Sequence, residues 1–169
     1  LVGVLERLGM AVAARAEAVD QRVARVARDL GLAGRVDVGD DHHVGVVEAV
    51  AEAVEEVAKA GVAVRLDDGD ELAIGRHVWR VIVGTGHSPA HACLYCPALK
   101  LLISGDQVLP RITTNVGVWG NQPEANPLKL FLDGMSKFAA LPDDTLILPS
   151  HDRVFTGLHP RIAALHEHH

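Results

Sequence analysis

Three apolar runs in the second half of the chain each end within a few residues of a side chain that binds metal ions well. The run 78–83 precedes His87, the run 101–104 precedes Asp106, and the run 145–149 precedes His151. If these runs are neighbouring strands that end at the same edge of one sheet, the loops that leave them converge. Loops on a rigid scaffold are where proteins build sites. The pattern therefore predicts that the three side chains lie close together.

Imidazole and carboxylate groups together suit zinc, iron or manganese. Each residue also has an ordinary interpretation when it is taken alone. His87 is compatible with a loop histidine at the end of a strand, and Asp106, after Ser-Gly, with the cap of a turn. The repetition of the strand-then-ligand pattern is what favours a metal site.

Four local sequences make the interpretation more specific. They are, in chain order, Gly86-His87-Ser88-Pro89-Ala90-His91, Ser104-Gly105-Asp106, Asn126-Pro127-Leu128 and Leu148-Pro149-Ser150-His151. Together they resemble the C-terminal part of the metallo-β-lactamase-fold hydrolases, the superfamily that includes glyoxalase II. The resemblance runs from about Leu66 to the end of the chain. It is specific because several motifs occur in order, whereas a lone Gly-His-x-x-x-His would be weak.

The resemblance implies a fold, a site and an activity. The fold is α/β, the second half of an αββα metallo-β-lactamase-type sandwich, here preceded by a helical segment. His87 would bind a first metal ion, Asp106 would bridge two, and His151 would bind the second. The implied cofactor is zinc, two ions in the intact protein, with iron or manganese as alternatives. The implied reaction is hydrolysis of an ester, thioester or lactone by a metal-activated water.

Two departures from the family pattern affect these expectations. Ser150 and Asp152 stand where the family has glycines on either side of the last histidine. The upstream His-x-His-x-Asp-His segment, which supplies most of the remaining ligands, has no match in the sequence. Asp40-Asp41-His42-His43 has the right residue types in the wrong order, and we interpret it as a solvated loop that caps a helix. Because the chain also opens at Leu1, we expect the C-terminal portion of a longer protein, inactive or weakly active alone.

The periodicity divides the chain into two regions. Residues 1–60 have apolar residues at helical spacing and form a helical segment or insertion; residues 61–169 form the C-terminal half of the metallo-β-lactamase-like domain. The expected strands are 62–66, 71–74, 77–83, 92–96, 100–104 and 145–148, and the expected helices begin at Asn126-Pro127 and at Pro160. Asp-Gly within 67–70 predicts a turn between the first two strands.

Composition limits the classes of partner. The 169 residues are 49% hydrophobic, enough for a domain with a real core, and no uncharged apolar run reaches the ~20 residues of a membrane span. The net charge of −6 argues against nucleic-acid binding, which depends on basic side chains. We therefore expect a small-molecule substrate. Two cysteines and no secretory h-region fit a reducing compartment, the cytoplasm.

Several other conspicuous residues receive no metal role. Cys93 and Cys96 are three residues apart in a predicted strand, so they point to opposite faces and we expect buried thiols. His91 is expected to support the loop of His87 by hydrogen bonding. Trp79 is predicted to lie in the core, and Trp119 to line a substrate pocket.

Two other functions remain open at this stage. One is a non-catalytic or degenerate half-domain that acts as an interaction module. The other is a non-haem iron dioxygenase of the same fold. Half of a sandwich would also expose an apolar sheet face, so we expect the chain to bind its missing N-terminal segment or a second copy.

Overall fold

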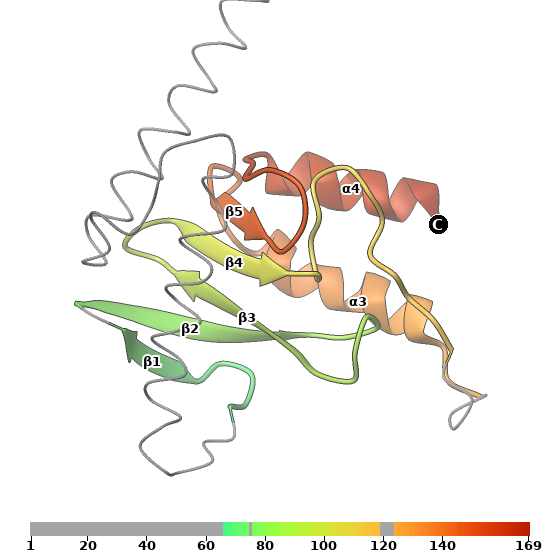
Figure 1. Ribbon diagram of the computed structural model, residues 1–169, viewed down its shortest axis with the longest axis horizontal. Coiled ribbons are helices and arrows are strands. Elements are labelled where there is room, and N and C mark those ends of the chain that lie inside the picture. The colour runs from blue at the N-terminus through green and yellow to red at the C-terminus, as the bar shows by residue number, and fades with distance from the viewer. Residues whose placement is uncertain (1–65, 75, 119–123) are drawn as a thin grey trace, which may run out of the picture.

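The computed structural model describes residues 66–74, 76–118 and 124–169 (Figure 1). Its elements are β1 (Glu71–Ile74), β2 (His77–Gly84), β3 (His91–Cys96), β4 (Leu101–Gly105), α3 (Pro127–Ala139), β5 (Leu146–Pro149) and α4 (Leu158–His168). Each corresponds to a predicted element, with bounds that agree or differ by at most two residues. The predicted helical segment 1–60, the strand residues 62–65 and Trp119 lie outside the described residues.

The five strands form one sheet in the order β1-β2-β3-β4-β5. Neighbouring strands from β1 to β4 are antiparallel, whereas β4 and β5 are parallel. As a result β2, β4 and β5 run in the same direction, and their C-terminal ends share one edge of the sheet. The strand β3 runs the other way and begins at that edge, where His91 pairs with Gly84.

The turn before β1 forms as predicted, but its strand partner was not indicated by the sequence. Asp70 N–H donates to Asp67 O over 3.1 Å, and Gly69 has φ +91°. The strand β1 pairs with β2, and Gly69 N–H also donates to Val81 O over 2.9 Å. Turn chemistry is local, but the partner of a short strand is decided by the packing of the sheet.

The sheet buries apolar side chains on both faces. On one face, Trp79, Val81, Leu94, Leu101 and Leu148 belong to one cluster. On the other face, side chains of four strands pack against α3 and α4: Ile82, Cys93, Tyr95, Leu102 and Ile147 meet Phe131, Met135, Phe138, Leu158, Ile162 and Leu165. Figure 1 shows both helices on the same side of the sheet. The alternation along each strand accounts for the two clusters, and it confirms that Trp79 is a core residue.

The start of α3 follows from its sequence. Asn126 is the N-cap, and its side-chain oxygen accepts the N–H of Lys129 over 3.0 Å. Pro127 at the first helical position lacks the N–H that would have no partner there. This cap fixes where the helix begins, and so it directs Phe131 into the core beneath the loop that leaves β2.

Among the described residues, none of the helices is long and apolar enough to span a membrane.

In the loop that follows β2, both the backbone conformation and the lack of space favour glycine at position 86. Gly86 has φ +97°, and a Cβ there would lie 2.5 Å from Phe131 Cβ and 2.6 Å from Pro127 O. We expect Gly86→Ala to lower the free energy of unfolding by ~2–5 kcal/mol, because left-handed strain adds to overpacking. Gly69→Ala is the matched control: φ is +91° but no atom lies within 4 Å of the added Cβ. Urea titrations of both variants measure the difference, and equal losses would contradict the clash.

Candidate metal centre

The site lies at the edge of the sheet where β2, β4 and β5 end. His87 follows β2 by three residues, Asp106 follows β4 directly, and His151 follows β5 by two residues. The parallel pairing of Gly105 with Pro149 brings the last two loops together. The structure therefore brings the three predicted side chains to one edge, although β3 lies between β2 and β4.

Asp106 is the centre of the arrangement. Its Oδ2 lies 3.4 Å from His87 Nε2, and its Oδ1 lies 3.4 Å from His151 Nε2. The side chains of His87 and Asp106 are each 28% exposed, whereas that of His151 is 65% exposed. One carboxylate thus faces two imidazoles, one on each oxygen, and the whole group remains open to solvent.

A backbone carbonyl orients the His87 ring. His87 Nδ1 lies 3.0 Å from Asn115 O. Because a carbonyl only accepts, Nδ1 is the donor of this hydrogen bond, and Nε2 is the nitrogen that faces Asp106. The donor types and this orientation fit a divalent metal ion.

The donors do not make a complete metal site on their own. In the described ranges, no group of three or more His, Cys, Asp or Glu side chains is arranged to hold a metal ion. Asp106 forms two donor pairs, one with each histidine, and a catalytic zinc commonly has three protein ligands plus water. Each pair therefore needs further ligands.

His91 packs between the strand ends. Its ring meets the His87 ring edge to face, with centroids 5.5 Å apart. A Cβ on Gly105, which has φ +52°, would lie 2.4 Å from His91 Nε2, so the glycine makes room for this ring. Burial and then the nearby His87 lower the pKa of His91, against the opposing effects of Asp106 and the Ser104 backbone. His91 is therefore a neutral packing partner of the His87 loop.

Three contacts in the site were not predicted from the sequence. They are the Asn115 carbonyl on His87, the Ser150 hydroxyl donating to Asp106 Oδ1, and the Thr114 hydroxyl donating to Asp106 O over 2.5 Å. The first and third involve backbone oxygens, which any residue provides, so no sequence signal marks them. Ser150 could have been found from the sequence, because it stands where the family pattern has a glycine, directly before the predicted ligand His151.

The loop after His151 contains a second departure from the family pattern. Asp152 has φ +68°, a conformation in which glycine is unstrained and aspartate is tolerated. Its Oδ1 accepts the N–H of Arg153 over 2.8 Å, and its Oδ2 lies 3.5 Å from Arg111 Nε. These contacts allow the loop to keep a turn that otherwise favours glycine.

The two cysteines take no part in the site. Both thiols are free and buried, and they belong to the two opposite core clusters, as predicted. The Cys93 Sγ donates to Ser104 O over 3.3 Å, and burial raises the pKa of this thiol well above its usual range. Both thiols are therefore part of the hydrophobic core.

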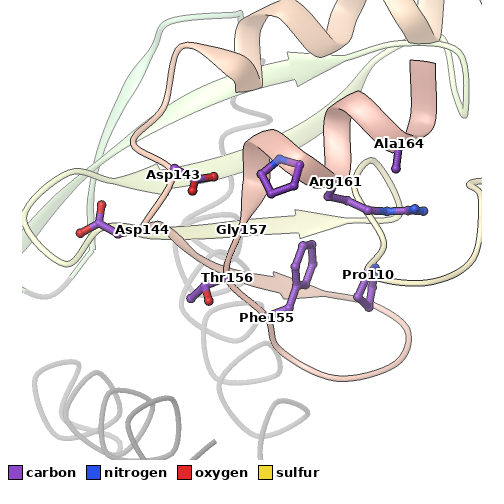
Figure 2. A pocket seen from close by; sticks show the side chains of 9 residues that line it. Pro110, Asp143, Asp144, Phe155, Thr156, Gly157, Arg161 and Ala164 are labelled. Atoms are coloured by element: carbon purple, nitrogen blue, oxygen red, sulfur yellow. The ribbon is translucent and has the colours of Figure 1, made fainter. Parts of the chain in front are cut away.

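A separate hollow of about 840 Å³ lies beside α4 (Figure 2). It is lined by Pro110, Asp143, Asp144, Phe155, Thr156, Gly157, Pro160, Arg161 and Ala164. Arg161 donates from Nε to Leu109 O over 2.6 Å and from Nη2 to Ile112 O over 2.8 Å. Figure 2 shows this side chain extending towards Pro110. The arginine thus anchors the loop that follows Asp106.

Comparisons with known proteins agree with this architecture. Residues 12–151 match the model of the metallo-beta-lactamase superfamily, a range that begins upstream of Leu66. A beta-lactamase domain protein from Burkholderia ambifaria is 42% identical, with a TM-score of 0.62 over 76% of this chain and 44% of that one. A metallo-beta-lactamase family protein from Thermus thermophilus is 25% identical, with a TM-score of 0.57 over 71% of this chain and 45% of that one.

A curated relative adds a functional name. The hydroxyacylglutathione hydrolase of Maricaulis maris is 29% identical over 103 residues, which are 61% of this chain and 37% of that protein. A second hydroxyacylglutathione hydrolase, from Fuscovulum blasticum, is 33% identical over 87 residues, 52% of this chain and 31% of that protein. The chain thus spans less than half the length of these proteins.

The α/β fold predicted from the sequence is confirmed by the five-stranded sheet with its helices and by the match to the superfamily model.

Proposed function

The chain belongs to the metallo-beta-lactamase superfamily, and from this we propose that it is part of a metal-dependent hydrolase that acts on an ester, thioester or lactone. The observation that supports the proposal best is the position of Asp106 between two imidazoles, each 3.4 Å from one of its oxygens. This is the donor arrangement that two neighbouring cations with one shared carboxylate would need.

The proposed roles follow from the contacts. His87, oriented by the Asn115 carbonyl, would hold one cation through Nε2, and His151 would hold the other. Asp106 would contribute one oxygen to each. Cations held there make a nucleophile available from water at neutral pH and polarise the oxygen of the group that is attacked. Zinc is the proposed metal, two ions in the intact protein, with iron or manganese as alternatives.

The substrate class is the more specific part of the proposal. Similarity to two hydroxyacylglutathione hydrolases supports an acyl ester or thioester. The net charge of −6 supports a small-molecule substrate and not a nucleic acid. The two free, buried thiols support a cytoplasmic location. The remaining ligands would come from an upstream segment, bound in the same chain or supplied with a second copy.

A paired assay tests this function. The 169-residue chain and a longer protein that restores the upstream coding sequence are given zinc and offered a panel of thioesters and lactones. We expect poor turnover by the chain alone and at least ~100-fold faster turnover by the longer protein, because each cation then gains its missing ligands. Equal turnover would show that upstream ligands are dispensable.

Two other results would indicate a different function. A longer protein with stoichiometric iron and oxygen-consuming activity would indicate the dioxygenase, and a metal-free stable dimer would indicate an interaction module.

A further inference from the structure

We propose that Ser150 is a positioning residue for Asp106. Its hydroxyl group orients the carboxylate so that one of the two oxygens, Oδ1, faces His151. The inference rests on the proposed function, because it concerns the metal centre formed by the same donors. It differs from that function in naming a residue that the superfamily pattern fills with glycine.

Ser150 joins the two loops that carry Asp106 and His151. Its backbone N–H donates to Gly105 O over 3.1 Å, and its hydroxyl donates to Asp106 Oδ1. The two bonds reach consecutive residues at the end of β4, from the residue directly after β5. They hold the end of one strand to the end of its parallel neighbour at the point where both loops leave the sheet.

The hydroxyl makes the two oxygens of Asp106 different. Oδ1 accepts from Ser150 and faces His151, whereas Oδ2 faces His87. A carboxylate oxygen has two lone-pair positions, so Oδ1 can accept the hydroxyl and still offer one position to a cation. Without the hydroxyl the carboxylate is free to rotate about its last torsion, which is soft. The hydrogen bond therefore holds the carboxylate in the orientation in which Oδ1 faces His151 and Oδ2 faces His87.

The preset orientation has a measurable consequence. Hydrogen bonds to metal-ligating carboxylates typically contribute 10–100-fold to metal affinity. Loss of the Ser150 hydroxyl should weaken the binding of a cation that uses Oδ1 and His151. A cation that uses Oδ2 and His87 should be affected less, since His87 is held independently by the Asn115 carbonyl.

Cobalt(II) titration of the 169-residue chain tests the proposal, followed by visible absorption and by broadening of the histidine ring protons in NMR spectra. We expect Ser150→Ala to weaken cobalt binding by ~10-fold or more and Ser150→Thr, which keeps a hydroxyl, to restore it. When His87→Ala is already present, Ser150→Ala should still weaken cobalt binding by a similar factor. When His151→Ala is already present, the effect of Ser150→Ala on cobalt affinity should be smaller. Ser136→Ala is the matched control, because its hydroxyl bonds Asp133 O on α3 over 2.8 Å and lies outside the site.

The outcomes separate this inference from the proposed function. If the single variants His87→Ala and His151→Ala weaken cobalt binding but Ser150→Ala leaves it unchanged, Ser150 has no positioning role and the metal centre stands. If cobalt affects neither histidine in the wild-type chain, the Ser150 inference is overturned, whereas the proposed function, which takes further ligands from an upstream segment, is decided by the paired assay. Circular dichroism must show that Ser150→Ala keeps the wild-type melting temperature. If Ser150→Thr fails to restore the affinity while the fold is intact, the hydroxyl is not the cause.

Discussion

Replacing Asp106 with asparagine in the longer protein proposed above should abolish zinc binding and lower turnover by more than ~100-fold, because each oxygen of the carboxylate is proposed to hold one cation. His87 and His151 each lie 3.4 Å from one of them. Asparagine has the same shape but no charge, and it offers one acceptor oxygen where aspartate offers two. Removing a shared ligand disables both positions, so the effect should exceed the 10–100-fold that supporting residues contribute.

Zinc content by elemental mass spectrometry and thioester turnover measure this effect. Asp133→Asn provides the control, because Asp133 lies on exposed helix surface and pairs with Lys129 over 2.5 Å, four residues earlier. Such a surface pair contributes under about 1 kcal/mol to stability and nothing to the site. Full zinc content in the Asp106→Asn variant would show that Asp106 is not a metal ligand. Its position between the two histidines would then have a structural role only.

The sheet could be predicted from the sequence because its inner strands are short apolar runs bounded by turn residues. Leu101 and Leu102 belong to different core clusters, as do Ile147 and Leu148, so these strands are buried on both faces and their sequences are continuously apolar. The ordered motifs then indicated the common edge, since ligand-bearing loops that follow parallel strands must meet. His87, Asp106 and His151 could therefore be placed together from the sequence.

The finer geometry could not be predicted, because it depends on contacts between distant segments. The Asn115 carbonyl reaches His87 from 28 residues away, and the Ser150 hydroxyl reaches Asp106 from 44 residues away. The pairing of β1 with β2 is local by contrast, since Ile74 lies opposite His77, and it was not predicted because the turn signal at 67–70 lies at the other end of β1. A local turn signal at 67–70 states that the chain reverses, but not which strand it meets afterwards.

The packing under the site leads to the largest expected effect on stability. Phe131 is completely buried in the cluster between the sheet and the two helices. It also lies directly under Gly86, whose absent Cβ would be 2.5 Å from Phe131 Cβ. The loop that carries His87 therefore passes over the Cα and Cβ of this residue, atoms that an alanine would keep. We expect Phe131→Ala to lower the free energy of unfolding by ~3–5 kcal/mol, the usual cost of removing a buried aromatic ring.

The same substitution should leave the metal centre of the folded chain nearly unchanged. The atoms under Gly86 are Phe131 Cα and Cβ and Pro127 O, which alanine keeps, so cobalt affinity should stay close to that of the wild-type chain. Leu130→Ala is the matched control, because Leu130 is the adjacent residue but is 51% exposed, and its loss should be within about 0.5 kcal/mol. Urea unfolding and cobalt titration without denaturant measure the two effects separately. Reduced cobalt affinity in the folded Phe131→Ala chain would show that the His87 loop also depends on the lost ring, and not only on the retained Cα and Cβ.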